Sequence, residues 1–271
     1  MTNEQYLNFL LMVGGGASDS IDSDYQAVLD NATSEGFSLP SASQQVHQNT
    51  LVTDLKSAGV WDLLEGLWVY ATDGDSDFAT YNWIDADATR ATINNAIAHG
   101  DDGFTSASGT IGSINTNHVA GSSGLFTNTS ASYGVYSNTS FGTTTGNQYA
   151  VTSNFANQRL RYANHPSGGN RLASPNGALS SFAPSSSVGL MGMQKVGSGN
   201  LQGLQADGTL TSVDTGNGDT GLSTLSVLNL RYSSTNYEGN VGLCWVGDQF
   251  TLAQWSAFVT AVDTYIANKD S

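Results

Sequence analysis

The stretch Asn240-Val-Gly-Leu-Cys-Trp-Val-Gly-Asp248 decides the fold class, because an unbroken apolar run gives way directly to a helical pattern. The run predicts a core strand over 238–246. Thr251 then caps a predicted helix over 251–267. Its apolar residues recur at helical spacing: Leu252, Trp255, Phe258, Val259, Val262 and Ile266. Such a helix normally packs back on the sheet, and a helix that binds a partner is the alternative.

Residues upstream of this strand, back to about residue 62, have the texture of an all-β chain. Short runs with alternating apolar side chains recur roughly every 8–12 residues, and clusters of Gly, Asn, Ser and Asp separate them. We predict strands near 63–71, 78–84, 91–97, 109–114, 132–136, 149–153, 159–162, 179–182, 188–196, 200–206, 210–215 and 225–232. Asp207-Gly208 predicts a tight hairpin turn in which both residues have positive φ. This spacing is typical of an antiparallel sandwich or barrel.

The first sixty residues have a helical pattern instead. Asp22 or Ser23 can cap a helix that Gly36 ends, and a short helix is expected before it over 6–11. A third helix, closed by Gly59, is expected to bury the stripe Val46, Leu51 and Leu55. We therefore divide the chain into a helical N-terminal anchoring segment, 1–60, and a β-sandwich domain, 61–271.

The charge balance excludes two classes of partner. The chain has 23 acidic and 8 basic residues among 271, which gives a formal net charge of −15. A field of this sign repels phosphate backbones, so we expect no nucleic-acid partner. It also disfavours an anionic membrane surface. The charged residues make up only 11 % of the chain, so uncharged polar residues must cover most of the surface.

Neither the cysteine nor the N-terminus indicates secretion. Cys244 is the single cysteine, so no intrachain disulfide can form, and its apolar neighbours predict a buried small side chain. The segment 1–13 has no basic start, and a glutamate and two asparagines interrupt its apolar residues. We read it as neither a signal peptide nor a membrane span, and expect synthesis without Sec export.

Several segments resemble known proteins. The segments 25–30, 39–45, 55–61, 71–79 and 82–83 resemble the N-terminal part of a family of bacteriophage structural proteins. The strand 240–248 and the helix start at 251–255 resemble the end of a laminin-G-like or concanavalin-like domain. The resemblance implies a mainly β fold, a concanavalin-like antiparallel β-sandwich (jelly roll) with a small helical N-terminal segment and a C-terminal helix.

The same resemblance implies a function in a virion. The chain would be a capsid decoration protein, a head fibre or a tail-associated protein that contacts capsid or tail proteins through residues 1–60. It would display a lectin-like sandwich to host-surface glycans, and it could form a homo-oligomer. The family supplies no catalytic residue, and the Ser/Thr/Asn/Gly-rich stretch 106–145 departs most from it.

The ionisable residues do not predict an enzyme. Glycosidases on this type of sandwich need paired carboxylates on one strand face. The chain has only four glutamates, and none has such a partner set: Glu4, Glu35, Glu65 and Glu238. The histidines are scattered, and no Gly-x-Ser-x-Gly sequence offers a nucleophile. We expect a non-enzymatic protein without a cofactor, and a glycan-degrading enzyme is the alternative.

The run Asp73-Gly-Asp-Ser-Asp77 is the sharpest polar cluster. Asp73, Asp75 and Asp77 at alternate positions could hold a calcium ion. An EF-hand would need a glutamate where Ile84 stands, so that form is excluded. The alternative is a solvated turn whose aspartates cap the neighbouring backbone.

Tyrosines in the β region are candidates for glycan contact. Tyr133, Tyr136, Tyr149 and Tyr162 alternate with small polar residues, so some should face outward. Exposed tyrosine beside Asn and Ser is typical of recognition surfaces, and burial on one face is the alternative. Trp61, Trp68 and Trp83 lie in apolar runs and are expected in the core. A polysaccharide-binding module on the same fold is therefore a second reading.

Overall fold

The protein is described from a computed structural model. Main chain and side chains are described for residues 20–94, 97–106, 112–119, 121–127, 129–139, 186, 188–197, 200–212 and 239–271. The backbone alone is described for 148–152, 159–165, 169–173, 179–182, 213–214 and 226–229. The expected first helix, 6–11, lies outside these residues.

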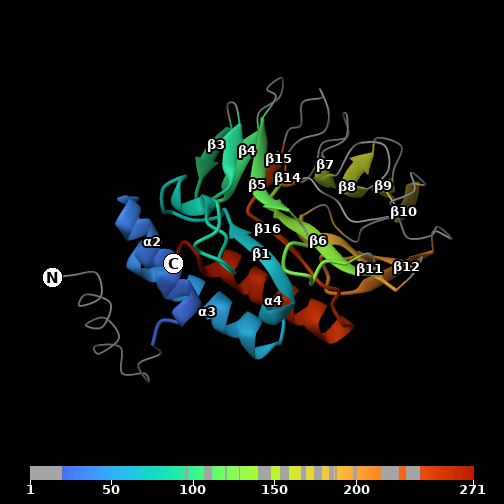
Figure 1. Cartoon of the computed structure of the whole chain (residues 1–271), viewed down its shortest axis with the longest axis horizontal. Helices are drawn as coiled ribbons and strands as arrows, with labels where there is room; N and C mark the ends of the chain where they lie inside the picture. Colours follow the sequence, from blue (N-terminus) through green and yellow to red (C-terminus); the bar gives the residue numbers. More distant parts are fainter. Residues whose placement is uncertain are drawn as a thin grey trace.

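Helices cover one face of a sheet, and further strands cover the other face (Figure 1). The helices are α2 (Ser23–Glu35), α3 (Ala42–Ser57) and α4 (Leu252–Asn268). The central sheet has the order β1 (Leu64–Val69), β16 (Leu243–Gly247), β6 (Ser130–Ser137), β11 (Gly189–Val196), β12 (Asn200–Leu204) and β13 (Leu210–Asp214). Every neighbouring pair in it is antiparallel.

The second layer contains two further antiparallel sheets. One has the order β10 (Leu179–Phe182), β9 (Gly169–Ala173), β8 (Arg159–His165), β7 (Gln148–Thr152), β14 (Ser226–Asn229), β5 (Ser113–Val119) and β2 (Thr92–Asn94). The other has the order β15 (Gly239–Val241), β4 (Gly103–Ser106) and β3 (Ile97–Gly100). Single turns of 3-10 helix, η1 (Trp61–Leu63) and η2 (Phe78–Thr80), flank β1. The predicted mainly β sandwich with N-terminal helices and a C-terminal helix is confirmed.

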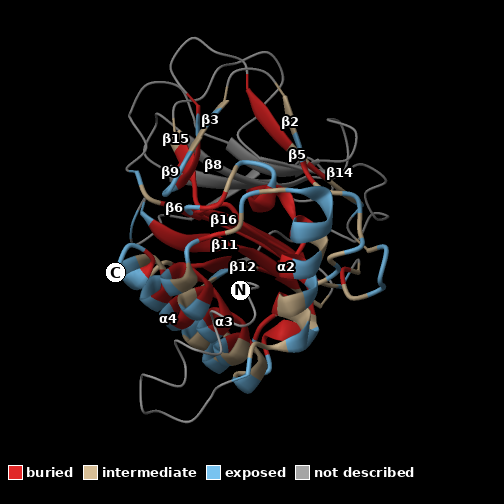
Figure 2. Cartoon of the chain, turned by 90° about the vertical axis from the view of Figure 1, so that its left-hand side faces the viewer, coloured by how far each residue is buried: buried red, intermediate tan, exposed pale blue. Residues whose placement is uncertain are grey.

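The central sheet is buried on both faces, as Figure 2 shows for β6, β11 and β16. Along β16 the side chains alternate between two cores, because successive residues of a strand point to opposite faces. Leu243 and Trp245 join the core beneath the helices. Cys244 and Val246 join the core between the sheets. This double burial explains why the strand is one continuous apolar run.

Trp245 fits because two glycines lie beside it in the sheet. Gly134 on β6 is the register partner of both Trp245 and Gly192 on β11. A β-carbon on Gly134 would collide with the Trp245 ring, and one on Gly192 would lie 3.0 Å from the same ring. On its other side the indole packs against Trp255 and Phe258 of α4, at ring-centroid distances of 5.5 and 5.2 Å. The C-terminal helix therefore packs back on the sheet, as expected.

The N-terminal helices belong to the same core as the sheet. Tyr25 of α2 and Leu51 of α3 are buried in one cluster with Trp245 and Trp255. The boundary drawn at residue 60 therefore does not separate two hydrophobic cores. The predicted stripe on α3 is wrong at Val46, which is 42 % exposed.

Polar side chains take part of the buried face of α3. Gln44 and Gln48 are fully buried. Gln48 hydrogen-bonds Tyr25 of α2, Thr72 after β1 and Tyr265 of α4. Such groups are stable in a core only when their partners are present, so this network fixes the three helices against the end of β1. Apolar periodicity could not reveal a buried face made of glutamines.

Two local predictions needed correction. The Asp207-Gly208 hairpin joins β12 and β13, but only Gly208 has positive φ, and Gln205 N donates to Thr209 O. The turn is therefore longer than a two-residue turn, with glycine in the left-handed position.

The expected strand 78–84 is instead η2 followed by an extended segment. No helix in the described part of the chain has the length and apolarity to cross a membrane.

We predict that Gly134→Ala lowers the free energy of unfolding by about 2 kcal/mol, because the new methyl group overpacks the sheet against Trp245. Chemical denaturation followed by tryptophan fluorescence measures the loss. Gly100→Ala is the control, since a β-carbon there has no neighbour within 4 Å. Equal stability of the two variants would contradict the described packing.

Deleting residues 1–58 is expected to prevent cooperative folding, because it removes Tyr25, Leu51 and Gln48 from the shared core. Thermal unfolding of the truncated and full chains measures this. A truncated chain that keeps a sharp transition would show that the sandwich is a separate folding unit.

Candidate functional site

The three aspartates proposed for calcium do not converge. Asp73 accepts a hydrogen bond from Ser41 N, and Asp75 accepts from Ser38 N and Phe78 N. Asp77 is ion-paired with Arg90 at 3.2 Å. Among the described residues no group of three or more acidic, histidine or cysteine side chains could hold a metal ion. The calcium prediction is wrong, because the carboxylates bind backbone N–H groups and an arginine instead.

The tyrosine prediction is wrong for two of its four residues. Tyr133 is fully buried between the sheets, and Tyr136 is 7 % exposed beneath the helices. Both faces of β6 are covered, so neither tyrosine faces solvent. Tyr149 and Tyr162 are direct partners in the β7–β8 ladder, but their side chains lie outside the described residues. The three tryptophans expected in the core, Trp61, Trp68 and Trp83, are buried.

Glu65 is the centre of a different arrangement. It is the extra residue of a β-bulge in β1, since Leu64 pairs with Gly247 and Gly66 with Val246. A bulge redirects its side chain, and the Glu65 carboxylate is fully buried. Both oxygens accept hydrogen bonds from the loop after β5.

The donors to Glu65 come from one short loop and the strand before it. Oε2 accepts from Gly121 N at 2.6 Å and lies 3.2 Å from His118 Nε2. Oε1 accepts from Ser123 Oγ, Leu125 N and Phe126 N at 2.7, 3.0 and 2.9 Å. Burial alone would raise the pKa of Glu65, but these hydrogen bonds outweigh it and lower the pKa to about 2. The carboxylate is therefore ionised at neutral pH and holds the loop 121–126 in place.

A second bulge faces the first. On β5 three residues, Thr116–His118, lie opposite a single residue of β14, because Asn115 pairs with Leu228 and Val119 with Ser226. Asn117 has a φ of 57°, which a non-glycine residue rarely adopts. The bulge gives His118 access to Glu65, and the Asn117 amide donates to Arg90 O and Thr92 Oγ1 at 2.7 Å each.

The two bulges border a pocket of about 530 Å³, which we call the Glu65 hollow. It lies within the size range of small-molecule sites. Its lining is mainly uncharged: Leu64, Glu65, Trp68, Asn82, Ile84, Asp85, Ala88, Thr89, Asn117, His118, Val119, Ser122, Ser123 and Leu125. Trp68 is fully buried, and its indole N–H has no hydrogen-bond partner in the described part of the protein.

The segment after η2 closes the free edge of β1 beside this hollow. The Asn82 side chain accepts from Leu67 N and Ile84 N and donates to Glu65 O. Trp83 N donates to Leu67 O. Asn82 thus replaces a neighbouring strand, so the edge of β1 that forms the hollow's wall is not open for pairing.

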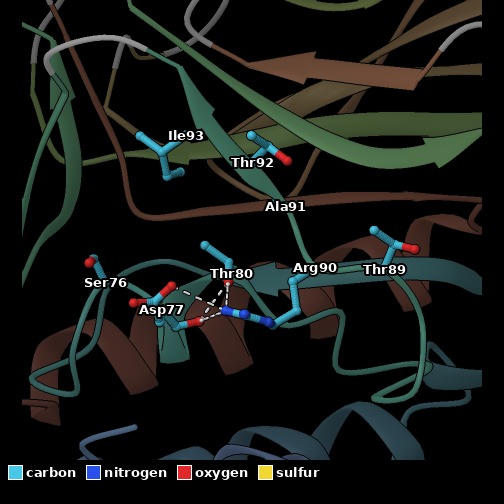
Figure 3. Close-up of a pocket in the computed structure, with 8 residues that line it drawn as sticks. All are labelled: Ser76, Asp77, Thr80, Thr89, Arg90, Ala91, Thr92 and Ile93. Carbon is cyan, nitrogen blue, oxygen red and sulfur yellow. Dashed lines mark hydrogen bonds and ion pairs between the residues drawn. The ribbon is translucent and has the colours of Figure 1, made fainter. Parts of the chain in front are cut away.

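A second pocket of about 500 Å³, the Arg90 hollow, adjoins the first at the segment 85–92, which we call the ridge. Its lining is Ser76, Asp77, Thr80, Thr89, Arg90, Ala91, Thr92 and Ile93. Figure 3 shows the Arg90 side chain turned toward Asp77 and Thr80, with Ser76 and Thr89 at opposite ends. Thr89 lines both hollows.

Arg90 fixes the segment that separates the hollows. Its guanidinium is ion-paired with Glu35 of α2 at 3.1 Å and with Asp77 at 3.2 Å. It also lies 4.4 Å from the ring centroid of Phe37. Asn31 of α2 holds the other end by donating to Ala86 O at 3.0 Å. The ridge 85–92 is therefore held from α2, η2 and β5 together.

Sequence reasoning considered Glu65 only as a catalytic acid and did not find this arrangement. A bulge interrupts periodicity instead of producing a pattern, and the partners of Glu65 lie more than fifty residues away. The one local signal was the run Gly121-Ser-Ser-Gly124, whose two glycines both have positive φ. Such turns present successive backbone N–H groups to an anion.

Comparisons with known proteins show limited similarity. No family model and no curated protein matches the chain. A Trypanosoma rangeli sialidase in complex with 2,3-difluoro-KDN is similar over 82 % of this chain and 40 % of that chain, with 9 % identity and a TM-score of 0.49. The botulinum neurotoxin serotype D binding domain is similar over 74 % of this chain and 52 % of that chain, with 14 % identity and a TM-score of 0.43. The chain thus spans between two fifths and about half of these proteins, and no residue role is transferred from them.

Glu65→Gln is expected to lower the free energy of unfolding by about 3 kcal/mol at pH 7, because the pKa of Glu65 is lowered from 4.5 to about 2 on folding. A depressed folded-state pKa stabilises the protein above the unfolded pKa, and this stabilisation is lost as the pH falls toward 2. The difference between variant and wild type should therefore shrink between about pH 5 and pH 2. Urea unfolding across this range measures it.

Asp62→Asn is the matched control, since Asp62 is exposed and the same change removes one carboxylate. A Glu65→Gln protein as stable as this control at pH 7 would contradict the role of Glu65 in holding the loop.

Proposed function

We propose that this chain is a non-enzymatic glycan-binding protein that holds a sugar in the Glu65 hollow. The observation that carries the proposal is a fixed pocket whose mainly uncharged lining combines hydroxyl and amide side chains with apolar ones. Hydroxyl and amide side chains suit a polyhydroxyl ligand, because each sugar hydroxyl both donates and accepts. The buried ring of Trp68 also lines the hollow, beside these hydroxyl and amide groups.

Preorganisation supports the same proposal. The wall 121–126 is fixed by the hydrogen bonds to Glu65, and the ridge 85–92 by Arg90 and Asn117. A wall that is already ordered costs little entropy when a ligand binds. A sugar offers few apolar groups and so gains little free energy from burial. Its affinity therefore depends strongly on a low entropy cost of binding.

The ionised state of the buried Glu65 supports a binding function over turnover. The lone pairs of Glu65 are occupied by its donors, and its pKa is about 2, so it is not protonated at neutral pH and cannot serve as a general acid. Two other acids line the hollows among the described residues: Asp77 is paired with Arg90, and Asp85 is exposed. Sustained release of reducing ends from an oligosaccharide by the purified protein would overturn the non-enzymatic part of the proposal.

We further propose a virion as the setting, on the sequence resemblance over residues 25–83. Since α2 and α3 form part of the core, attachment to capsid or tail would use residues 1–19 or the outer faces of these helices. A chain without residues 1–19 tests the first route: co-sedimentation with particles should fall while the thermal transition stays. Absence of the full-length chain from purified particles would contradict the virion setting.

For the glycan, we predict that wild-type protein binds members of a glycan array and that Ser122→Trp abolishes this signal. Ser122 is exposed and lines the Glu65 hollow, so an indole there fills the pocket without entering the core. Ser57→Trp is the control, because Ser57 is an exposed residue at the end of α3 and lines neither hollow. An array without signal at high protein concentration, or equal loss in both variants, would contradict the proposed site.

A further inference from the structure

We propose that the Glu65 hollow and the Arg90 hollow form one groove for an extended, neutral oligosaccharide that crosses the ridge at Thr89. This inference rests on the proposed glycan binding and adds the length and charge of the ligand. Each hollow has the volume of a small-molecule site, about 530 and 500 Å³. Thr89 is exposed and lines both, so a bound chain would continue from one hollow into the other.

One side chain connects the walls of the two hollows. Asn117 lines the Glu65 hollow, while its amide nitrogen donates to Arg90 O and to Thr92 Oγ1, whose residues line the Arg90 hollow. The bulge in β5 therefore ties the backbone of Arg90 and the side chain of Thr92 to the wall of the Glu65 hollow.

The ridge 85–92 is anchored by hydrogen bonds to the segments on either side of it. Ala91 N donates to Thr80 O at 2.9 Å, and Asn31 donates to Ala86 O and to Asp87 Oδ1 at 3.0 Å each. With these hydrogen bonds on both sides, the ridge is a fixed wall of the hollows and does not act as a mobile lid. Because the ridge is anchored between two pockets, an extended ligand can fill both pockets at once, whereas a compact ligand fills one.

The charges along the groove favour a neutral glycan. Among the described residues Arg90 is the one Lys or Arg that lines the two hollows, and Glu35 and Asp77 neutralise it. The carboxylates of Glu65, Asp77 and Asp85 also line the groove. Together with the net charge of −15, this field repels uronic acids and sulfated sugars.

The Arg90 hollow offers hydroxyl groups as its contacts. Ser76, Thr80, Thr89 and Thr92 line it together with the Ile93 side chain. Ser76 and Thr89 are exposed at its two ends. Serine and threonine hydroxyls can each donate or accept a hydrogen bond. Such a lining suits the hydroxyl groups of successive sugar units better than one charged group.

The test measures affinity against chain length in three proteins by isothermal titration calorimetry. The probes are cello-, malto-, xylo-, manno- and chito-oligosaccharides from one unit to six. In wild type, affinity for the recognised series should rise about tenfold or more from the shortest binder to the longest, as a second hollow is filled. Ser76→Trp, which blocks only the Arg90 hollow, should reduce the longest member to the affinity of the shortest.

Ser122→Trp should abolish binding of every member, and Ser57→Trp should change nothing. Binding that is independent of length and insensitive to Ser76→Trp, but lost in Ser122→Trp, would overturn the groove while leaving the glycan site intact. Binding of none of the series would instead overturn the proposed function. Tighter binding of oligogalacturonate than of any neutral chain would overturn the charge argument.

Discussion

The structure depends on one sheet that is buried on both faces. A strand in such a sheet must satisfy two cores at once, which is why β16 is apolar at every position from Leu243 to Val246. The helix-facing core is the more demanding of the two, because the Trp245 indole has to lie flat against β6 and β11. Gly134 and Gly192 make that possible, and α4 closes over the ring from outside. Helices α2 and α3 complete the same layer, so all three described helices and the central sheet share this packing.

The Glu65 hollow lies next to β1, the edge strand of this sheet, and the Arg90 hollow adjoins the Glu65 hollow. At the edge strand β1 a bulge at Glu65 interrupts the alternation. The bulge turns the carboxylate toward the loop 121–126, where it accepts hydrogen bonds from three backbone N–H groups. Desolvation of a carboxylate is costly, and here charge-assisted hydrogen bonds offset it. A second bulge on β5 and the cation Arg90 fix the remaining walls. The two hollows are thus a consequence of breaks in regular pairing next to a rigid, fully packed sheet.

Much of the fold was predictable from the sequence, and the site was not. The Trp245 run, the capping Thr251 and the Asp207-Gly208 hairpin are local signals, and each element was found where its chemistry indicated. Tyr133 and Tyr136 were misjudged because alternation says which residues share a face but not that helices cover the second face. The buried glutamines of α3 and the carboxylate of Glu65 escaped for a common reason. Their stability depends on partners distant in the sequence, which periodicity cannot reveal.

The central claim is that sugars bind in the groove bordered by Glu65 and Arg90. Two-dimensional NMR of the isotope-labelled full chain, titrated with an oligosaccharide selected on the array, tests it most directly. We predict that the Trp68 indole N–H signal and the amides of Gly121, Thr89 and Thr92 shift together in a saturable way. Unchanged signals at these positions, with shifts confined to other strands or to the helices, would contradict the account.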